Sequence, residues 1–149
     1  MGAPVISAYR CQDVVENHHP CYAGHLEINP VEYQDKLFEE SDFIAVLGSR
    51  LDGITSREET LIKDDDKWAH IHPDNIVLER FNSDIPVQSD VVPLLTDIMN
   101  RIEQKDHKDS KWRSKAHSDY LKFSTAGSYP VNGSVDLSFI AETARELLP

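Results

Sequence analysis

Three short polar segments each follow a predicted β-strand and carry side chains that could bind a small molecule. They are Gly48-Ser49-Arg50-Leu51-Asp52, His72-Pro73-Asp74-Asn75 and Gln88-Ser89-Asp90. Gly48 would let a ligand approach the backbone closely, and Arg50 is the only cation of its turn, able to pair with a phosphate or a carboxylate. Asp52 could accept hydrogen bonds from ribose hydroxyls or orient Arg50. A tight turn with a surface ion pair would leave the same pattern, because an isolated Gly-x-Arg-x-Asp is a weak signal.

Runs of apolar residues predict the strands that position these segments. Residues 43–47 are apolar without interruption and are followed by a glycine, which predicts a strand buried on both faces, as in a parallel sheet covered by helices. Further strands are predicted at residues 4–8, 68–72 and 85–88. Sheets of this kind bind ligands beyond the carboxyl ends of their strands. The three polar segments are therefore the places where a ligand is expected.

Helical patterns lie between and after the predicted strands. A short helix is expected at residues 30–40, with Asn29 as its cap, and a stronger one from Asp90 to Ile102, with Asp90 as its cap. A polar helix is expected at residues 105–123, and a last helix with one apolar face follows Ser134. The polar helix carries a thin apolar stripe of Trp112, Ala116 and Tyr120. The alternation of strands and helices predicts an α/β fold of the doubly wound type.

The charge of the chain argues against nucleic acid as a partner. The formal net charge is -11, and residues 1–100 alone carry 7 basic and 19 acidic side chains. Such a field repels a polyanion. The basic residues after Arg101 are interrupted by aspartates, which is typical of a solvated helix surface.

Neither cysteine chemistry nor a membrane anchor is indicated. Cys11 and Cys21 fit no redox or zinc spacing, so reduced thiols in a cytosol are expected. The longest apolar run, residues 43–47, is far shorter than the roughly 18 residues of a spanning helix. No signal peptide is visible, so we expect a cytoplasmic protein. Asn132-Gly133-Ser134 matches the glycosylation sequon, which has no consequence without secretion.

Metal binding and nucleophilic catalysis are both disfavoured. His70 and His72 alternate on one predicted strand, and further histidines lie in the loop of residues 18–25, but no carboxylate or thiol stands at a typical ligand spacing. No Gly-x-Ser-x-Gly elbow is present. We therefore assign no catalytic residue and no metal ligand to this chain.

Several motifs follow one another in a characteristic order: Pro4-Val5, His19-Pro20, Tyr22, Gly24, residues 42–51, residues 69–73 and Ser89-Asp90. This order resembles the central domain of thiamine diphosphate-dependent enzymes of the acetolactate synthase type. The resemblance is strongest to the acetolactate synthase-like branch, through residues 9–13, residues 17–20, Arg50-Leu51 and residues 60–62. It covers residues 4–102, while Trp112 and residues 135–149 resemble the linker and opening helix of the next domain.

The resemblance implies a division of the chain and a longer parent. Residues 1–103 would be the later part of a nucleotide-binding-like central domain with an incomplete Rossmann-like parallel sheet and flanking helices. Residues 104–133 would be a helical connector, and residues 134–149 the opening helix of the diphosphate-binding domain. The first domain with its catalytic glutamate, the first glycine-rich strand and helix of the central domain, and the Gly-Asp-Gly motif would lie outside this chain.

The implied function is that of a piece of a carboligase or decarboxylase acting on 2-oxo acids. The parent would bind thiamine diphosphate and Mg²⁺ and form a homodimer or homotetramer with its remaining domains, whereas this chain alone would be inactive. A free-standing nucleotide-binding module with the same sheet and no catalysis is the alternative. The reading frame around the chain would separate the two.

The resemblance also carries a nucleotide-binding role onto particular residues. In this family the central domain binds FAD in acetolactate synthases, ADP in some relatives and nothing in others. The positions that match are Gly48, Arg50, Asp52, His70, Ile71, Asn75, Ser89 and Asp90. Cys11, Asp13 and Ser89 stand where flavin-binding members usually have glycines, which argues against flavin.

Overall fold

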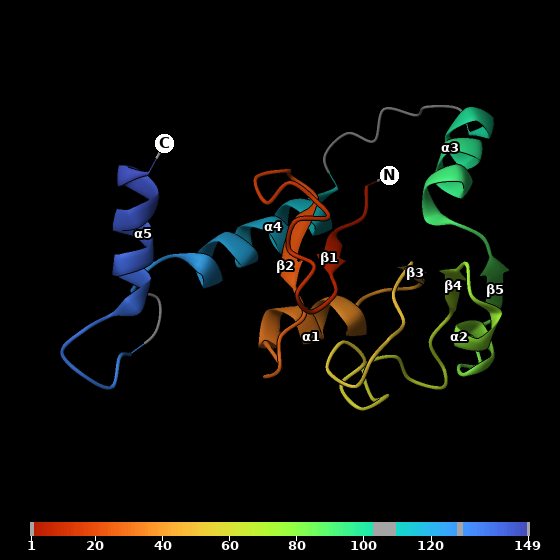
Figure 1. Cartoon of the computed structure of the whole chain (residues 1–149), viewed down its shortest axis with the longest axis horizontal. Helices are drawn as coiled ribbons and strands as arrows, with labels where there is room; N and C mark the ends of the chain where they lie inside the picture. Colours follow the sequence, from red (N-terminus) through yellow and green to blue (C-terminus); the bar gives the residue numbers. More distant parts are fainter. Residues whose placement is uncertain (1, 103–109, 128–129, 149) are drawn as a thin grey trace.

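The computed structural model describes residues 2–102, 110–127 and 130–148, whose elements alternate between strands and helices (Figure 1). The predicted α/β class is confirmed. In chain order the elements are β1 (Val5–Ser7), β2 (Tyr22–His25), α1 (Glu32–Glu39), β3 (Ile44–Leu47), β4 (Trp68–His72), α2 (Asn75–Glu79), β5 (Ile85–Gln88), α3 (Val91–Arg101), α4 (Lys111–Ser124) and α5 (Leu137–Leu147).

The strands form two parallel sheets. β1 pairs with β2, and β3, β4 and β5 form a second sheet with β4 in the middle. Across the molecule the strands follow the order β2, β1, β3, β4, β5 (Figure 1). Within the described residues no strand pairing joins β1 to β3.

The strand β3 differs from its prediction. Its sequence predicts burial on both faces, but Leu47 is 43% exposed and Phe43, just before the strand, is 46% exposed. Only Ile44 and Val46 face a core. The prediction is wrong because β3 is an edge strand, paired with β4 alone. Burial on both faces is found instead in β4, where all five residues are buried.

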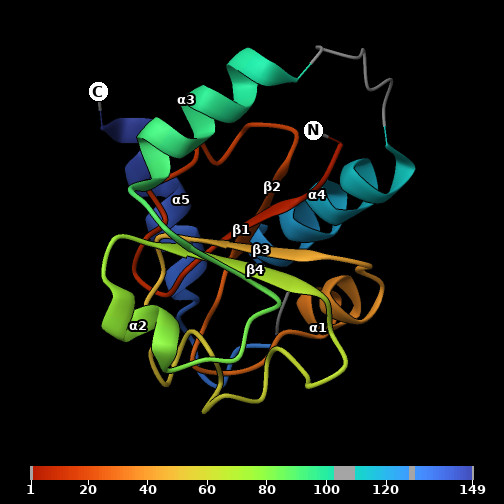
Figure 2. The ribbon, with the colours of Figure 1, turned by 90° about the vertical axis from the view of Figure 1, so that its right-hand side faces the viewer.

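Each sheet has its own hydrophobic core. Beside β1 and β2 the core consists of Ala23, Leu37 and Ala116, with Ile6, Tyr33 and Trp112 packed against it. Beside β3, β4 and β5 it consists of Val46, Leu51 and Trp68, with Ile44, Ile62 and Phe81 packed against it. Figure 2 shows α2 and α3 on opposite sides of β3 and β4.

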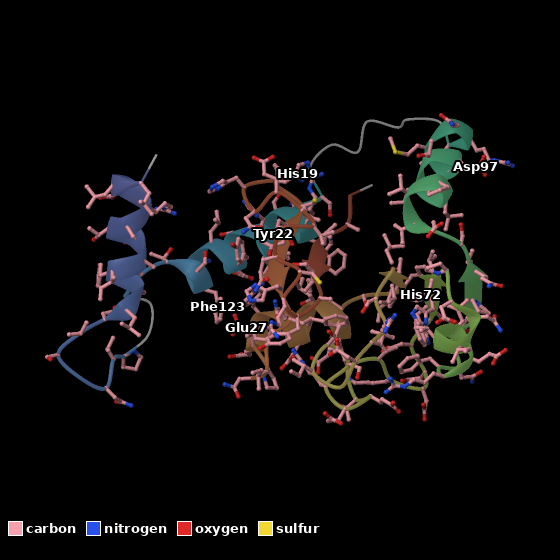
Figure 3. The ribbon with its side chains drawn as sticks, viewed as in Figure 1. His19, Tyr22, Glu27, His72, Asp97 and Phe123 are labelled. Carbon is pink, nitrogen blue, oxygen red and sulfur yellow. The ribbon has the colours of Figure 1, made fainter. Side chains whose placement is uncertain are left out.

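The helix α4 packs on the first sheet through the stripe that its sequence predicts. Ala116 is 1% exposed, the Trp112 indole donates to Glu40 at 3.0 Å, and the Tyr120 ring meets Tyr22 edge to face at 5.0 Å. His117 Nδ1 donates to the backbone oxygen of Tyr22 at 2.7 Å. Figure 3 shows Tyr22 beside this helix. The prediction began the helix at residue 105; residues 103–109 lie outside the described part.

Two helix starts differ from expectation. The first helix begins at Glu32, and its N-cap position is held by Val31 without a side-chain hydrogen bond, so Asn29 is not the cap. Asp90 does occupy the N-cap position of α3, but its carboxylate makes no capping bond. The capping that stabilises helix starts comes from Asp74, Ser110 and Asp136, at α2, α4 and α5.

The helix α5 has an apolar face that no other described element covers. It has no buried residue, and Leu137, Ile140 and Leu147 are each more than half exposed. In Figure 1 it stands apart from the two sheets. In the part of the chain that the structure describes, no helix is both long and apolar enough to cross a bilayer.

The His117 bond gives a test of how α4 is held. We expect His117→Ala to lower the free energy of unfolding by about 1 kcal/mol more than Ser118→Ala, because the buried Tyr22 carbonyl loses its donor. Both substitutions place alanine in the same helix, so their helix propensities change in the same direction. Urea unfolding measures the difference. Equal stability of the two variants would show that the His117 bond does not hold the helix.

Candidate functional site

The carboxyl ends of β3, β4 and β5 meet at one edge of the second sheet, as the sequence predicts for its three polar segments. Gly48 N–H donates to the Ile71 oxygen at 2.8 Å, and Ser89 N–H donates to the His72 oxygen at 3.2 Å. The Gln88 amide donates to the Pro73 oxygen at 3.3 Å. Figure 3 labels His72 at this edge. The structure thus brings the segments together.

Gly48 has a backbone that favours glycine, but its open side faces a helix. Its φ is +70°, in the left-handed region that side chains disfavour. A Cβ at this position would lie 3.1 Å from Cγ2 of Val91, the first residue of α3. The close approach that the missing side chain allows is therefore made by α3.

Arg50 is the one predicted cation of the site and is exposed. Among the described residues it has no hydrogen bond or ion pair. Its guanidinium is therefore available to a phosphate or a carboxylate.

Asp52 is occupied by its own turn. One carboxylate oxygen accepts from the backbone N–H groups of Ile54 at 3.1 Å and Thr55 at 3.0 Å, and the other accepts from the Thr55 hydroxyl at 3.3 Å. These bonds order the loop that follows. Asp52 makes no ion pair with Arg50, and its lone pairs are largely used before any ribose hydroxyl could approach.

His70 is completely buried and supports the turn after β3 from the interior of the protein. Its Nε2 donates to the Ser49 oxygen at 2.8 Å, and the rings of Trp68 and Phe81 lie 5.5 and 5.8 Å from it. Its Nδ1 is buried without a partner in the described structure. Burial lowers the pKa of His70, since a second ring proton would have no acceptor. His70 therefore positions the Gly48–Asp52 turn and does not reach the surface.

The remaining predicted residues have local partners. Ile71 is 5% exposed and contributes its backbone oxygen to Gly48. The Asn75 amide donates to Glu79 within α2. The Ser89 hydroxyl donates to the Asp90 backbone oxygen at 3.0 Å. Of the eight residues expected to bind a nucleotide, Arg50 and Asp90 are exposed and carry charged groups without a partner among the described residues, and Arg50 is the one cation of the two.

A family model for the central domain of thiamine pyrophosphate (thiamine diphosphate) enzymes matches residues 1–98. The chain belongs to this family. A search of curated proteins finds no match. The matched residues include both sheets and most of α3, so the edge where β3, β4 and β5 end belongs to a central domain. Such a domain is part of an enzyme that uses thiamine diphosphate.

The described residues do not fit thiamine diphosphate with its metal ion. No group of three or more His, Cys, Asp or Glu side chains among them could hold a metal. The sequence contains no Gly-Asp-Gly motif.

A small cavity between α1 and the loop of residues 56–66 was not foreseen from the sequence. Its volume is about 160 Å³, and its walls include Phe38, Leu61 and the side chains of two ion pairs. Arg57 pairs with Asp35, and Lys63 lies 4.0 Å from Glu39. Both cations already face carboxylates. No sequence signal marks the cavity, because the left-handed residues 57–59 that shape its loop are not glycines.

The burial of His70 predicts a pH dependence of stability. Its pKa in the folded chain lies below the ordinary value near 6.5 that it has when unfolded. The contribution of neutral His70 is thus complete above about pH 6.5 and is lost as the pH falls below it. His70→Gln keeps a donor for the Ser49 oxygen but does not titrate.

We expect the unfolding free energy of the native chain to fall more steeply between pH 7.5 and 5.5 than that of His70→Gln. Urea unfolding at a series of pH values gives both slopes. Subtracting one from the other removes the contribution of the other histidines, which both proteins share. Identical slopes would show that His70 is not held neutral by its surroundings.

Proposed function

We propose that this chain supplies the later part of the central domain, and the connector that follows, of a thiamine diphosphate-dependent enzyme acting on 2-oxo acids. The proposed type is acetolactate synthase-like, a carboligase or decarboxylase with Mg²⁺ as its metal and a homodimeric or homotetrameric assembly. Within it, residues 1–103 brace the neighbouring domains. Residues 104–133 act as the connector, and residues 134–149 open the diphosphate-binding domain.

The break between β1 and β3 is the observation that carries this proposal. The two strands lie beside each other in both views and enter from the same side of the molecule in Figure 2, yet they belong to different sheets. Parallel sheets in α/β proteins are normally continuous and covered on both faces. The break between β1 and β3 therefore supports a further parallel strand, from elsewhere in the same domain, that would lie between them.

The outer edge strands of the two sheets, β2 and β5, are protected from pairing with a further strand. On β2 the backbone oxygens of Tyr22, Ala23 and His25 accept hydrogen bonds from side chains of α1 and α4. On β5 the position paired with His70 is Pro86, which has no N–H to offer a further strand. Both are ways in which natural sheets protect their edges.

The inner edges have no such protection. Ile44 and Gly48 donate toward β4, so Ala45 and Leu47, which alternate with them, direct their N–H groups away from it. On β1 the Val5 N–H donates to the backbone oxygen of Cys21, on the side of β2. The N–H of Ile6, the next residue, therefore points toward the break between β1 and β3. A strand between β1 and β3 would form hydrogen bonds with both of them. Together with its helix it would cover the exposed Phe43 and Leu47.

The same added strand and helix would also cover the exposed side of α3. Val92 and Met99 of this helix, and Ile102 directly after it, are all more than half exposed, although the helix follows the last strand of the sheet. A helix in a doubly wound fold normally shares its apolar face with the sheet and with a neighbouring helix. The exposed side of α3 is consistent with a neighbour outside residues 2–148.

A nucleotide in the central domain is a second candidate, for the parent enzyme or for a free-standing module. The exposed and unpaired Arg50 favours it. Against it stand Val91, which occupies the open side of Gly48, and the bonds that use the Asp52 carboxylate. The acidic charge of residues 1–100 adds little attraction for a diphosphate. These features disfavour FAD more than ADP, because FAD needs more close contacts with the backbone.

Titration calorimetry of the 149-residue chain tests the assignment. We expect no binding of thiamine diphosphate with Mg²⁺ tighter than about 1 mM, because its site lies in other domains. The polypeptide encoded by the complete reading frame should bind both and consume pyruvate or another 2-oxo acid. ADP is titrated in parallel, with Arg50→Gln and the exposed Arg80→Gln as matched variants.

Two results would contradict the proposal. Micromolar binding of thiamine diphosphate by the 149-residue chain would show that the cofactor site is not elsewhere. ADP binding by this chain that depends on Arg50 but not on Arg80, together with a reading frame that encodes no further domain, would establish the nucleotide-binding module instead.

A further inference from the structure

Two pairs in the chain place a side-chain carbonyl directly before a glycine. They are Asp52-Gly53 and Asn132-Gly133. In such a pair the backbone nitrogen of the glycine can attack the carbonyl carbon of the preceding side chain, because glycine has no Cβ to hinder the approach. Both pairs can close a cyclic imide, Asp52 with loss of water and Asn132 with loss of ammonia, and their surroundings differ.

The first pair is held in place. The Asp52 carboxylate accepts hydrogen bonds from Ile54 and Thr55, and Thr55 is 2% exposed. A Cβ on Gly53 would lie 2.6 Å from a Glu58 carboxylate oxygen. The side chain is thus fixed toward the following turn and is not free to swing onto the Gly53 nitrogen.

The second pair is free. Asn132 and Gly133 are both exposed, and neither forms a hydrogen bond with any residue that the structure describes. The φ of Gly133 is +151°, and nothing lies within 4 Å of the position that a Cβ would occupy. The pair lies in the segment between α4 and α5, well away from both sheets (Figure 1).

The other asparagines lack this arrangement. Every one of them precedes a residue that has a side chain, and one of those residues is a proline without an N–H. They are Asn17, Asn29, Asn75, Asn82 and Asn100. Asn75 and Asn100 also lie in helices, where the backbone is fixed.

We propose that Asn132 is a site of spontaneous deamidation. The Gly133 nitrogen loses its proton and bonds to Cγ of Asn132, the bond from Cγ to Nδ2 breaks, and the amide nitrogen takes a proton and leaves as ammonia. Water then opens the cyclic imide at either carbonyl. The products are an aspartate or an isoaspartate at position 132, with no change of oxidation state.

Deamidation adds a negative charge four residues before Asp136, the N-cap of α5. The isoaspartate product also lengthens the backbone of the segment that carries this helix. The chemistry therefore changes the join between α4 and α5 and leaves the two sheets untouched.

Peptide mass spectrometry of the 149-residue chain, aged at neutral and at mildly alkaline pH, tests the proposal. We expect the peptide with Asn132 to convert to the acid at least about tenfold faster than those with Asn82 or Asn100, because only glycine leaves the nitrogen unhindered. Both aspartate and isoaspartate should form, and the rate should rise with pH.

Two variants serve as controls. Gly133→Ala should slow the conversion by about tenfold because its Cβ hinders the attack, and Asn132→Gln should nearly abolish it. The proposal is overturned if Asn132 converts no faster than Asn82, or if Gly133→Ala leaves the rate unchanged.

Discussion

A backbone N–H or C=O group at the edge of a sheet needs a partner, and this requirement organises the whole chain. On β2 the partners are side chains: Tyr33 donates to Ala23 at 3.0 Å, Gln34 to His25 at 2.9 Å and His117 to Tyr22 at 2.7 Å. The helix α4 is thereby bound to the first sheet. On β5, a proline removes a donor. Among the described strands, β1 and β3 keep edges without such devices, and these two edges lie beside each other (Figure 1).

At the carboxyl ends of the second sheet, the turns are supported by buried side chains. His70 holds the Ser49 oxygen from the interior, and Asp52 orders the loop beyond through Thr55. Both residues have the types expected of ligand contacts, yet their polar atoms are used to shape the backbone. Arg50 is left as the exposed charged side chain of the turn that has no partner among the described residues. A scaffold role with at most a lightly held nucleotide agrees with this arrangement better than a flavin site does.

The sequence predicted local features well and neighbour-dependent features poorly. The strands β4 and β5 and the apolar stripe of α4 lie where periodicity places them, because these patterns are properties of the segment itself. The strand β2 was missed since Ala23 and Gly24 carry no strand preference, and α2 is too short to show a period. The burial of β3 was overestimated because it depends on an adjacent strand. Likewise, sequence alone gave no indication that Val91 would cover Gly48.

Amide hydrogen exchange resolved by residue tests most directly whether the break between β1 and β3 is an open slot for a strand. In the 149-residue chain we expect the amides of Ala45, Leu47 and Ile6 to exchange far faster than that of Gly48, which donates to Ile71 at 2.8 Å. In the polypeptide extended by its preceding coding sequence, the first three should become protected. Slow exchange of Ala45 and Leu47 in the short chain, or no gain of protection in the extended one, would contradict the account.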